Sequence, residues 1–335
     1  AAFKLASTCL ASAFPIVGAS FLTAFATAWL SMERAFLLAS LSGLLVNLAL
    51  IAALFVVQHF QTPDQIAAQY IALTMALAGI GQAGFLLWSI LRRAGAPQRS
   101  WPDPRSLADL GKRLVPSLGV AAAPQLLFLV LVMQATQWSG SASQLIYAER
   151  LLQLPFGFMA ASLSIVVLPE MSRLYRDGAH PAFAQKSEQA VLLGLALAVP
   201  SAMGFIILAE PITLALFQHG AFSVAAARET AQTLQMLAPA LPLMAAIRVF
   251  GQAFFAQQLY RRPVFASSIG IMTAYVLSHV AQDGQQLAFI FTCATGVEFL
   301  VLIILSRPKS QILWRQNLHR GLLNLVFCNP LLALL

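Results

Sequence analysis

The chain has 335 residues, of which 59% are hydrophobic and 10% are charged, and its formal net charge is +8. Ordinary soluble domains contain roughly 25% charged residues, so this composition excludes a soluble globular fold and indicates an integral membrane protein. The basic excess does not require a nucleic acid, because Lys and Arg collect in the cytoplasmic loops of membrane proteins. Three cysteines, Cys9, Cys293 and Cys328, lie far apart without disulfide or metal-ligand spacing.

Apolar segments long enough to cross a bilayer follow one another along the chain. A membrane-spanning helix needs about 20 apolar residues, and a helix satisfies its backbone hydrogen bonds internally in lipid. The sequence therefore predicts an all-α polytopic membrane protein. The nine predicted spans are 8–31, 35–57, 68–91, 114–137, 144–168, 189–209, 230–256, 264–281 and 286–305. A tenth apolar stretch, 321–335, is expected to be an incomplete span.

Basic charge alternates between the connections that join these spans. The odd-numbered connections hold 16 of the 20 basic residues, whereas the even-numbered ones hold 1. The positive-inside rule then places the odd connections in the cytoplasm and the N-terminus, with Lys4, outside. The connection 92–113 is the longest and most basic and is predicted to be a cytoplasmic linker. It would separate an N-terminal lobe of three helices (1–91) from a C-terminal lobe of six helices and a partial seventh (114–335).

Motifs for catalysis or cofactor binding are weak in this sequence. Residues Gly79 to Gly84 read G-x-G-x-x-G, but a dinucleotide site needs a strand before this motif and an acidic residue after it. Inside a predicted span, helix packing is the better interpretation. The five histidines are scattered over loops and span ends, so we expect no metal site. No nucleophile with a matching base can be assembled, and we predict neither an enzyme nor a cofactor.

Arg150 is the first unusual charge, because it lies about six residues inside its predicted span. This places it about 9 Å below the outer end of the helix. One interpretation is an arginine whose head reaches back to the outer interface. The other is a binding residue that faces a cavity. The neighbouring Glu149 points about 100° away around the helix, so a simple surface pair with Arg150 is not expected.

Arg248 is the second unusual charge and lies deeper in its span. Pro239 and Pro242 precede it, and their missing N–H groups predict irregular backbone there. An arginine at this depth usually faces a cavity or a partner. Glu298, in another span, is a candidate for a structural ion pair with it. If Arg150 and Arg248 bind a ligand instead, that ligand is anionic, because a guanidinium binds phosphate with two parallel hydrogen bonds.

One segment carries a specific resemblance. Residues 147–175, YAERLLQLPFGFMAASLSIVVLPEMSRLY, resemble the YADRL-x-E-F-P-x-G segment at the eighth helix of the MurJ/MviN family, lipid II flippases of the MOP transporter superfamily. The resemblance continues through 195–223 and 251–264, and 14–36 and 42–55 resemble the family's fourth and fifth helices. It implies a MOP-type helical bundle whose spans correspond to family helices four to twelve, with a partial thirteenth.

The resemblance also implies a function. The family exports the undecaprenyl-pyrophosphate-linked peptidoglycan precursor across the bacterial inner membrane by alternating access, without enzymatic chemistry. Its substrate-binding residue in the eighth helix corresponds to Arg150, and Tyr147, Glu149 and Arg248 are further substrate-binding candidates. The partners it implies are this lipid substrate and membrane lipids, and a monomer is expected.

Two departures from the family qualify this expectation. The family's first three helices and their arginines have no counterpart here, and the sequence begins Ala-Ala-Phe-Lys. We therefore expect a chain that enters partway through a larger protein, is incomplete at both ends and does not transport alone. Some members bind sodium through acidic residues in their seventh and eleventh helices. Sodium is not expected here, because 114–137 and 264–281 contain no Asp or Glu.

Two alternatives remain open from the sequence. The first is another MOP-type exporter, either a polysaccharide-precursor flippase or a multidrug antiporter. An antiporter for cationic drugs should favour acidic residues in its cavity, whereas the internal charges here are mainly basic. The second is a truncated remnant that does not transport. The genomic sequence upstream of Ala1 separates a remnant from a flippase, since a stop codon there favours the remnant.

Overall fold

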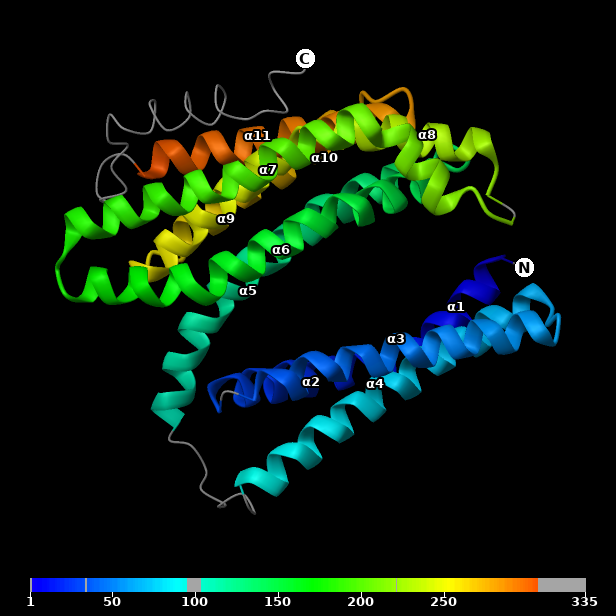
Figure 1. The fold of residues 1–335 in the computed structure, drawn as a ribbon, viewed down its shortest axis with the longest axis horizontal. Coiled ribbons are helices and arrows are strands. Elements are labelled where there is room, and N and C mark those ends of the chain that lie inside the picture. Colours follow the sequence, from blue (N-terminus) through cyan, green and yellow to red (C-terminus); the bar gives the residue numbers. More distant parts are fainter. Residues whose placement is uncertain (1, 34, 95–103, 221, 307–335) are drawn as a thin grey trace. The chain divides into compact units, whose positions relative to one another are not determined.

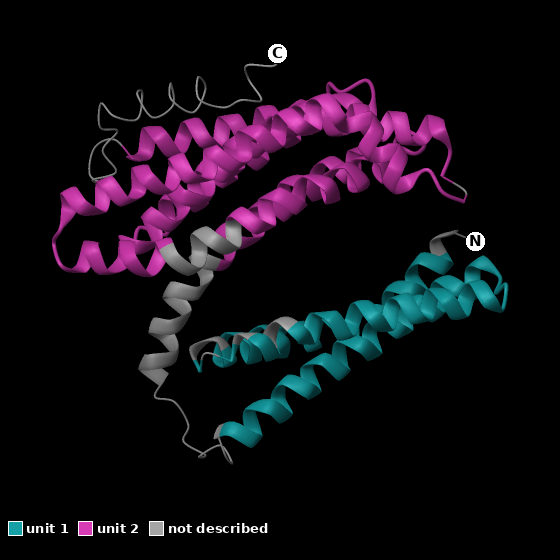
Figure 2. Cartoon of the chain, viewed as in Figure 1, with its two compact units in different colours: residues 1–102 teal, residues 103–335 magenta. Residues whose placement is uncertain are grey.

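The structure, a computed structural model, describes residues 2–33, 35–94, 104–220 and 222–306. Within them the secondary structure consists of eleven α-helices (Figure 1). The stretch 321–335, Cys328 and all but the first residue of the connection 306–320 lie outside these ranges. Chain contacts divide the protein into two compact units, residues 1–102 and 103–335 (Figure 2).

The first unit contains four helices. They are α1 (Ala2–Ala13), α2 (Pro15–Met32), α3 (Phe36–His59) and α4 (Asp64–Ala94). The first predicted span is divided between α1 and α2, because Pro15 has no backbone N–H and begins a new helix. Helices α2 and α3 both pack on α4.

Gly79 of the G-x-G-x-x-G motif lies at one of these helix contacts. A Cβ at this position would lie 2.8 Å from a side-chain carbon of Ile16 on α2, whereas Gly81 and Gly84 have open space beside them. The motif therefore sits inside α4, with no strand before it, and Gly79 allows α2 to approach. The expectation of helix packing is confirmed at this one glycine.

The second unit contains the other seven helices. They are α5 (Pro104–Ala135), α6 (Ser141–Arg176), α7 (His180–Phe217), α8 (Val224–Leu237), α9 (Ala240–Ala256), α10 (Arg261–Ser278) and α11 (Gly284–Ser306). Several are longer than the predicted spans. Residues 92–94 and 104–113 of the predicted linker belong to α4 and α5, because a helix continues through polar sequence once it has left the apolar part of its span.

The predicted span 230–256 is a broken helix. Its two parts, α8 and α9, are bent by 45° where Ala238 and Pro239 separate them. Pro239 and Pro242 lack the N–H groups that would continue the helical hydrogen bonds through this point. The first part, α8, is attached to its neighbours by side chains. Gln144 of α6 donates to Glu229 over 2.5 Å, and Thr292 of α11 donates to a backbone carbonyl of α8 over 2.8 Å.

The helices are apolar enough for a membrane protein. Six helical segments in the described ranges satisfy the length and hydropathy that a bilayer crossing needs, and the bent pair α8–α9 makes a seventh if it is one span. The predicted segments 144–168 and 264–281 fall on α6 and α10, which are not among those six. The prediction of an all-helical protein with multiple candidate spans is confirmed.

Candidate ligand cavity and charged residues

The N-terminal half of α6 positions three of the candidate residues, each with different surroundings. Arg150 is exposed and lies nine residues after the start of α6, a rise of about 14 Å. Glu149 is half-buried, and its carboxylate accepts a hydrogen bond from the side-chain amide of Gln153, one turn further on. The exposed Arg150 is therefore accessible to a ligand, whereas the carboxylate of Glu149 has a partner on its own helix.

Tyr147 has a packing role at the same end of α6. Its ring centroid lies 5.0 Å from that of Phe217, the last residue of α7, and 5.4 Å from that of Phe222 in the next connection. Such aromatic contacts each contribute about 0.5–1.5 kcal/mol beyond the area they bury. Tyr147 therefore joins α6 to the α7–α8 connection.

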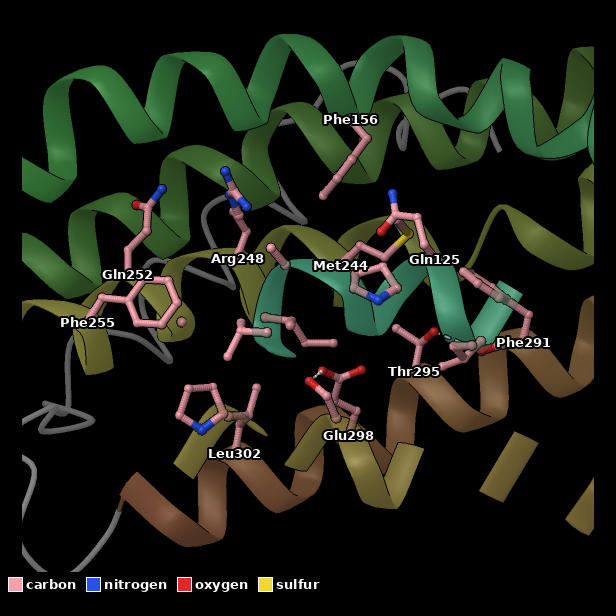
Figure 3. A pocket seen from close by; sticks show the side chains of 18 of the residues that line it. Gln125, Phe156, Met244, Arg248, Gln252, Phe255, Phe291, Thr295, Glu298 and Leu302 are labelled. Atoms are coloured by element: carbon pink, nitrogen blue, oxygen red, sulfur yellow. Dashed lines mark hydrogen bonds between the residues drawn. The ribbon is translucent and has the colours of Figure 1, made fainter. Parts of the chain in front are cut away.

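A cavity of about 280 Å³ lies inside the second unit, between α5, α6, α9, α10 and α11 (Figure 3). One water needs only about 10–15 Å³ by this measure, so the cavity has room for a small organic group. Aromatic and aliphatic side chains form much of its wall, among them Phe156, Met244 and Phe291. Its polar lining residues are Gln125, Arg248, Gln252, Ser267, Thr295 and Glu298.

Arg248 reaches this cavity from the middle of α9. The residues that follow it, Val249 and Phe250, are 1% and 2% exposed and belong to a core cluster. Arg248 itself is exposed and lines the cavity (Figure 3). The helical spacing that buries Val249 and Phe250 therefore turns Arg248 towards the cavity instead of the core.

Glu298 reaches the cavity from α11 and is 9% exposed. Its carboxylate accepts a hydrogen bond of 2.5 Å from the hydroxyl of Ser267 on α10. Gly270, one turn further along α10, allows this close approach, because a Cβ there would lie 3.1 Å from the Cβ of Glu298. The partner that the structure gives this carboxylate is thus the hydroxyl of Ser267, whereas the sequence had suggested Arg248 as a candidate partner. Arg248 and Glu298 lie on opposite sides of the cavity (Figure 3).

The candidate residues thus fall in two places within the second unit. The cavity brings together Arg248 and Glu298, and its lining does not include Tyr147, Glu149 or Arg150. Sequence reasoning missed Ser267. Only its polar hydroxyl, in a span otherwise rich in small and apolar residues, could have indicated a role. In the described part of the chain, no group of three or more His, Cys, Asp or Glu residues could hold a metal ion.

An all-helical protein with many apolar helices and charged residues at an internal cavity belongs to the polytopic membrane proteins. The family model for lipid II flippase MurJ matches residues 1–333. The chain therefore belongs to the MurJ family, a family of membrane transporters and not of enzymes. The resemblance found in residues 147–175 identified the family correctly.

Individual relatives agree with this membership. The chain is 30% identical over 281 residues to a probable lipid II flippase MurJ of Haemophilus influenzae, covering 81% of this chain and 53% of that protein. It is 28% identical over 262 residues to the one of Rhizobium meliloti, covering 77% and 48%. The chain thus spans about half the length of the curated relatives it matches.

A solved structure supports the fold. It is a lipid II flippase MurJ in an inward closed conformation, with a TM-score of 0.72 and 21% sequence identity. The match covers 93% of this chain and 65% of the solved chain. At this identity the likeness extends to the arrangement of helices, and the roles of individual side chains have to be argued from this chain.

Proposed function

We propose that the protein takes part in moving lipid II, the lipid-linked precursor of peptidoglycan, across the bacterial inner membrane by alternating access. Family membership over residues 1–333 supports this assignment. The nine predicted spans would cross the membrane as α1–α2 together, α3 to α7, α8–α9 together, α10 and α11. The N-terminus would lie outside, as the alternation of basic charge requires.

The observation that carries this proposal is Arg150, an exposed arginine that lies nine residues after the start of α6 and directly precedes the apolar central part of this helix. Its guanidinium has a planar set of donors that matches the oxygens of a diphosphate. An anionic ligand also offsets the cost of an arginine within a span. We propose Arg150 as the first contact for the diphosphate, and Arg248 in the cavity as a second contact. Glu149 and Tyr147 would help to position this end of α6.

Complementation tests the role of Arg150. The full-length gene that includes the coding sequence of this chain is expressed in bacteria depleted of their own lipid II flippase, as wild type and as Arg150→Ala. We expect wild type to restore growth and Arg150→Ala to fail, because the alanine removes the diphosphate donors. Arg150→Lys keeps the charge but not the planar donors, and should rescue partially.

The matched control is Arg176→Ala, which removes an exposed arginine from the last turn of the same helix. This variant should rescue like wild type. If Arg150→Ala also rescues fully, the proposed role of Arg150 is wrong. If wild type itself does not rescue while the protein is present in the membrane, the result favours a remnant that does not transport.

A further inference from the structure

The cavity in the second unit has charges of opposite sign on its two sides. Arg248 contributes a guanidinium from α9, and Glu298 contributes a carboxylate from α11 (Figure 3). The guanidinium has five N–H donors, so Arg248 can keep a protein contact and still donate to a ligand. The carboxylate has about four acceptor positions, and the hydroxyl of Ser267 occupies one of them. Both groups therefore keep hydrogen-bonding capacity for a bound molecule.

A ligand with a single charge matches only one side of this cavity. A cation is attracted by Glu298 and repelled by Arg248, and an anion is attracted by Arg248 and repelled by Glu298. The apolar walls strengthen both effects, since charges interact more strongly where water is scarce. A ligand with an ammonium group at one end and a phosphate at the other matches both sides at once. Charge complementarity therefore selects a zwitterion.

The volume of the cavity and the residues around it favour a lipid headgroup as the zwitterion. A phosphoethanolamine headgroup has about eight non-hydrogen atoms, which is compatible with a cavity of about 280 Å³. Arg248 and Gln125 are exposed, which marks a side on which the cavity is open. The half-buried apolar side chain of Phe255 can contact the first carbons of acyl chains. In a membrane, a phospholipid is also the zwitterion present at the highest local concentration.

We propose that this cavity binds the headgroup of an aminophospholipid, with its ammonium at Glu298 and its phosphate at Arg248. The amine nitrogen donates hydrogen bonds to the carboxylate, and the guanidinium donates to the phosphate oxygens. This site does not depend on transport. If Arg248 also receives the diphosphate of a lipid-linked precursor, as proposed above, the two lipids compete for the same guanidinium.

Lipid retention by the purified chain tests this proposal. The protein is delipidated in detergent and mixed with equal amounts of phosphatidylethanolamine, phosphatidylglycerol and phosphatidylcholine that share the same acyl chains. Native mass spectrometry then measures which lipid stays bound. We expect phosphatidylethanolamine to exceed each of the others by about tenfold, which corresponds to about 1.4 kcal/mol. Phosphatidylglycerol has no ammonium group, and the choline group has no N–H donor for Glu298.

Two variants and a control assign the preference to this cavity. Glu298→Gln should bring the ratio of phosphatidylethanolamine to phosphatidylglycerol close to one, and Arg248→Gln should lower retention of phosphatidylethanolamine. Glu229→Gln removes an exposed carboxylate of α8 that does not line the cavity, and should leave the ratio unchanged. Circular dichroism and gel filtration verify that each variant is folded.

Several results would overturn the assignment. Equal retention of phosphatidylethanolamine and phosphatidylglycerol by wild type, a comparison that needs no variant, contradicts recognition of the ammonium. An unchanged ratio in folded Glu298→Gln places any preference elsewhere. Displacement of the lipid by soluble phosphoethanolamine at low concentration assigns the site to a water-soluble zwitterion instead. None of these measurements uses transport, so their failure is distinguishable from failure of Arg150→Ala in complementation.

Discussion

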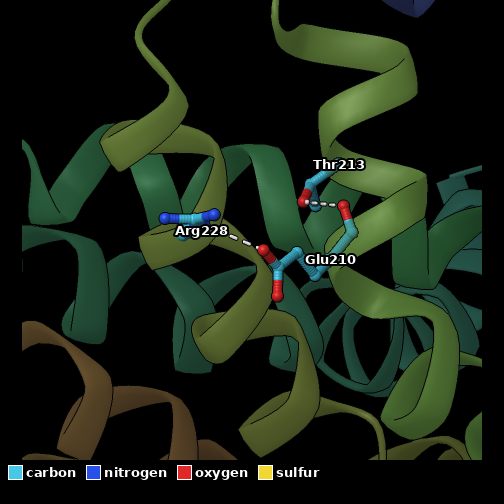
Figure 4. Close-up of polar contacts among 3 residues, drawn as sticks. All are labelled: Glu210, Thr213 and Arg228. Atoms are coloured by element: carbon cyan, nitrogen blue, oxygen red, sulfur yellow. Dashed lines mark hydrogen bonds and ion pairs between the residues drawn. The ribbon is translucent and has the colours of Figure 1, made fainter.

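Two carboxylates in the second unit, Glu298 and Glu210, show how differently the same group can be placed. Glu210, near the end of α7, accepts a hydrogen bond of 2.9 Å from Arg228 of α8, and their side chains are 50% and 62% exposed (Figure 4). Glu298 accepts a bond of 2.5 Å from the neutral hydroxyl of Ser267 and is 9% exposed. The exposed acid has a cationic partner, whereas the buried acid is matched by a hydroxyl.

This difference indicates where electrostatic energy is concentrated. An exposed ion pair contributes about 0–1 kcal/mol, because water already solvates both charges. A buried carboxylate loses that solvation and depends on every donor that its neighbours provide. Burial makes the Glu298 site the more sensitive of the two to substitution.

The largest expected effect comes from removing the donor to Glu298. Ser267→Ala should lower the free energy of unfolding by about 1–3 kcal/mol, because it deprives a buried acceptor of its partner. Denaturation in detergent micelles measures this change. The control is Ser268→Ala on the same helix, since the exposed Ser268 donates to the backbone carbonyl of Val264. Equal losses in the two variants would contradict a special role for Ser267.

Gly270→Ala should have a smaller effect. The added methyl would approach the Cβ of Glu298 to 3.1 Å, so α10 and α11 must separate slightly, at a cost of about 1–3 kcal/mol. A gain of up to about 1 kcal/mol in helix propensity partly offsets this cost. Gly296→Ala is the matched control, because its nearest neighbour would be a Leu243 carbon at 3.8 Å. Thermal unfolding should rank Gly270→Ala below Gly296→Ala, and the reverse order would contradict the close approach.

The smallest effect is expected at the exposed pair. Arg228→Ala should change stability by less than about 1 kcal/mol at low salt. The difference from wild type should shrink further in about 1 M salt, where the screening length falls to about 3 Å. Unfolding curves at two salt concentrations measure both quantities. A loss as large as that of Ser267→Ala would remove the contrast between the two carboxylates.

The sequence predicts the helices well because they depend on local properties. Long apolar runs require helices in lipid, and Pro15 and Pro239 stand where helices begin or break. Helix ends are predicted less well, because hydropathy reports the lipid-facing part and not the whole helix. The polar end of α6 is an example, where Glu170 forms an ion pair of 2.6 Å with Lys186 of α7.

The cavity could not be predicted from the sequence in the same way. Its walls come from residues between 120 and 302 in the chain, and only the packing of five helices brings them together. The sequence indicates Glu298 as a candidate, because a charge within a span is costly. It does not indicate Ser267, because serines in helices commonly donate to their own backbone, as Ser268 does. Which of two adjacent serines meets the carboxylate depends on the rotation of α10 against α11.

The closeness of Gly270 and Glu298 also limits which sequences can share this helix pair. The side chains at positions 270 and 298 share the space between α10 and α11. A larger side chain at one position must therefore be balanced by a smaller one at the other. Relatives with alanine or serine at position 270 are therefore expected to have a shorter side chain at position 298. The presence of an acid at 298 in natural sequences should accordingly be linked to the presence of glycine at 270.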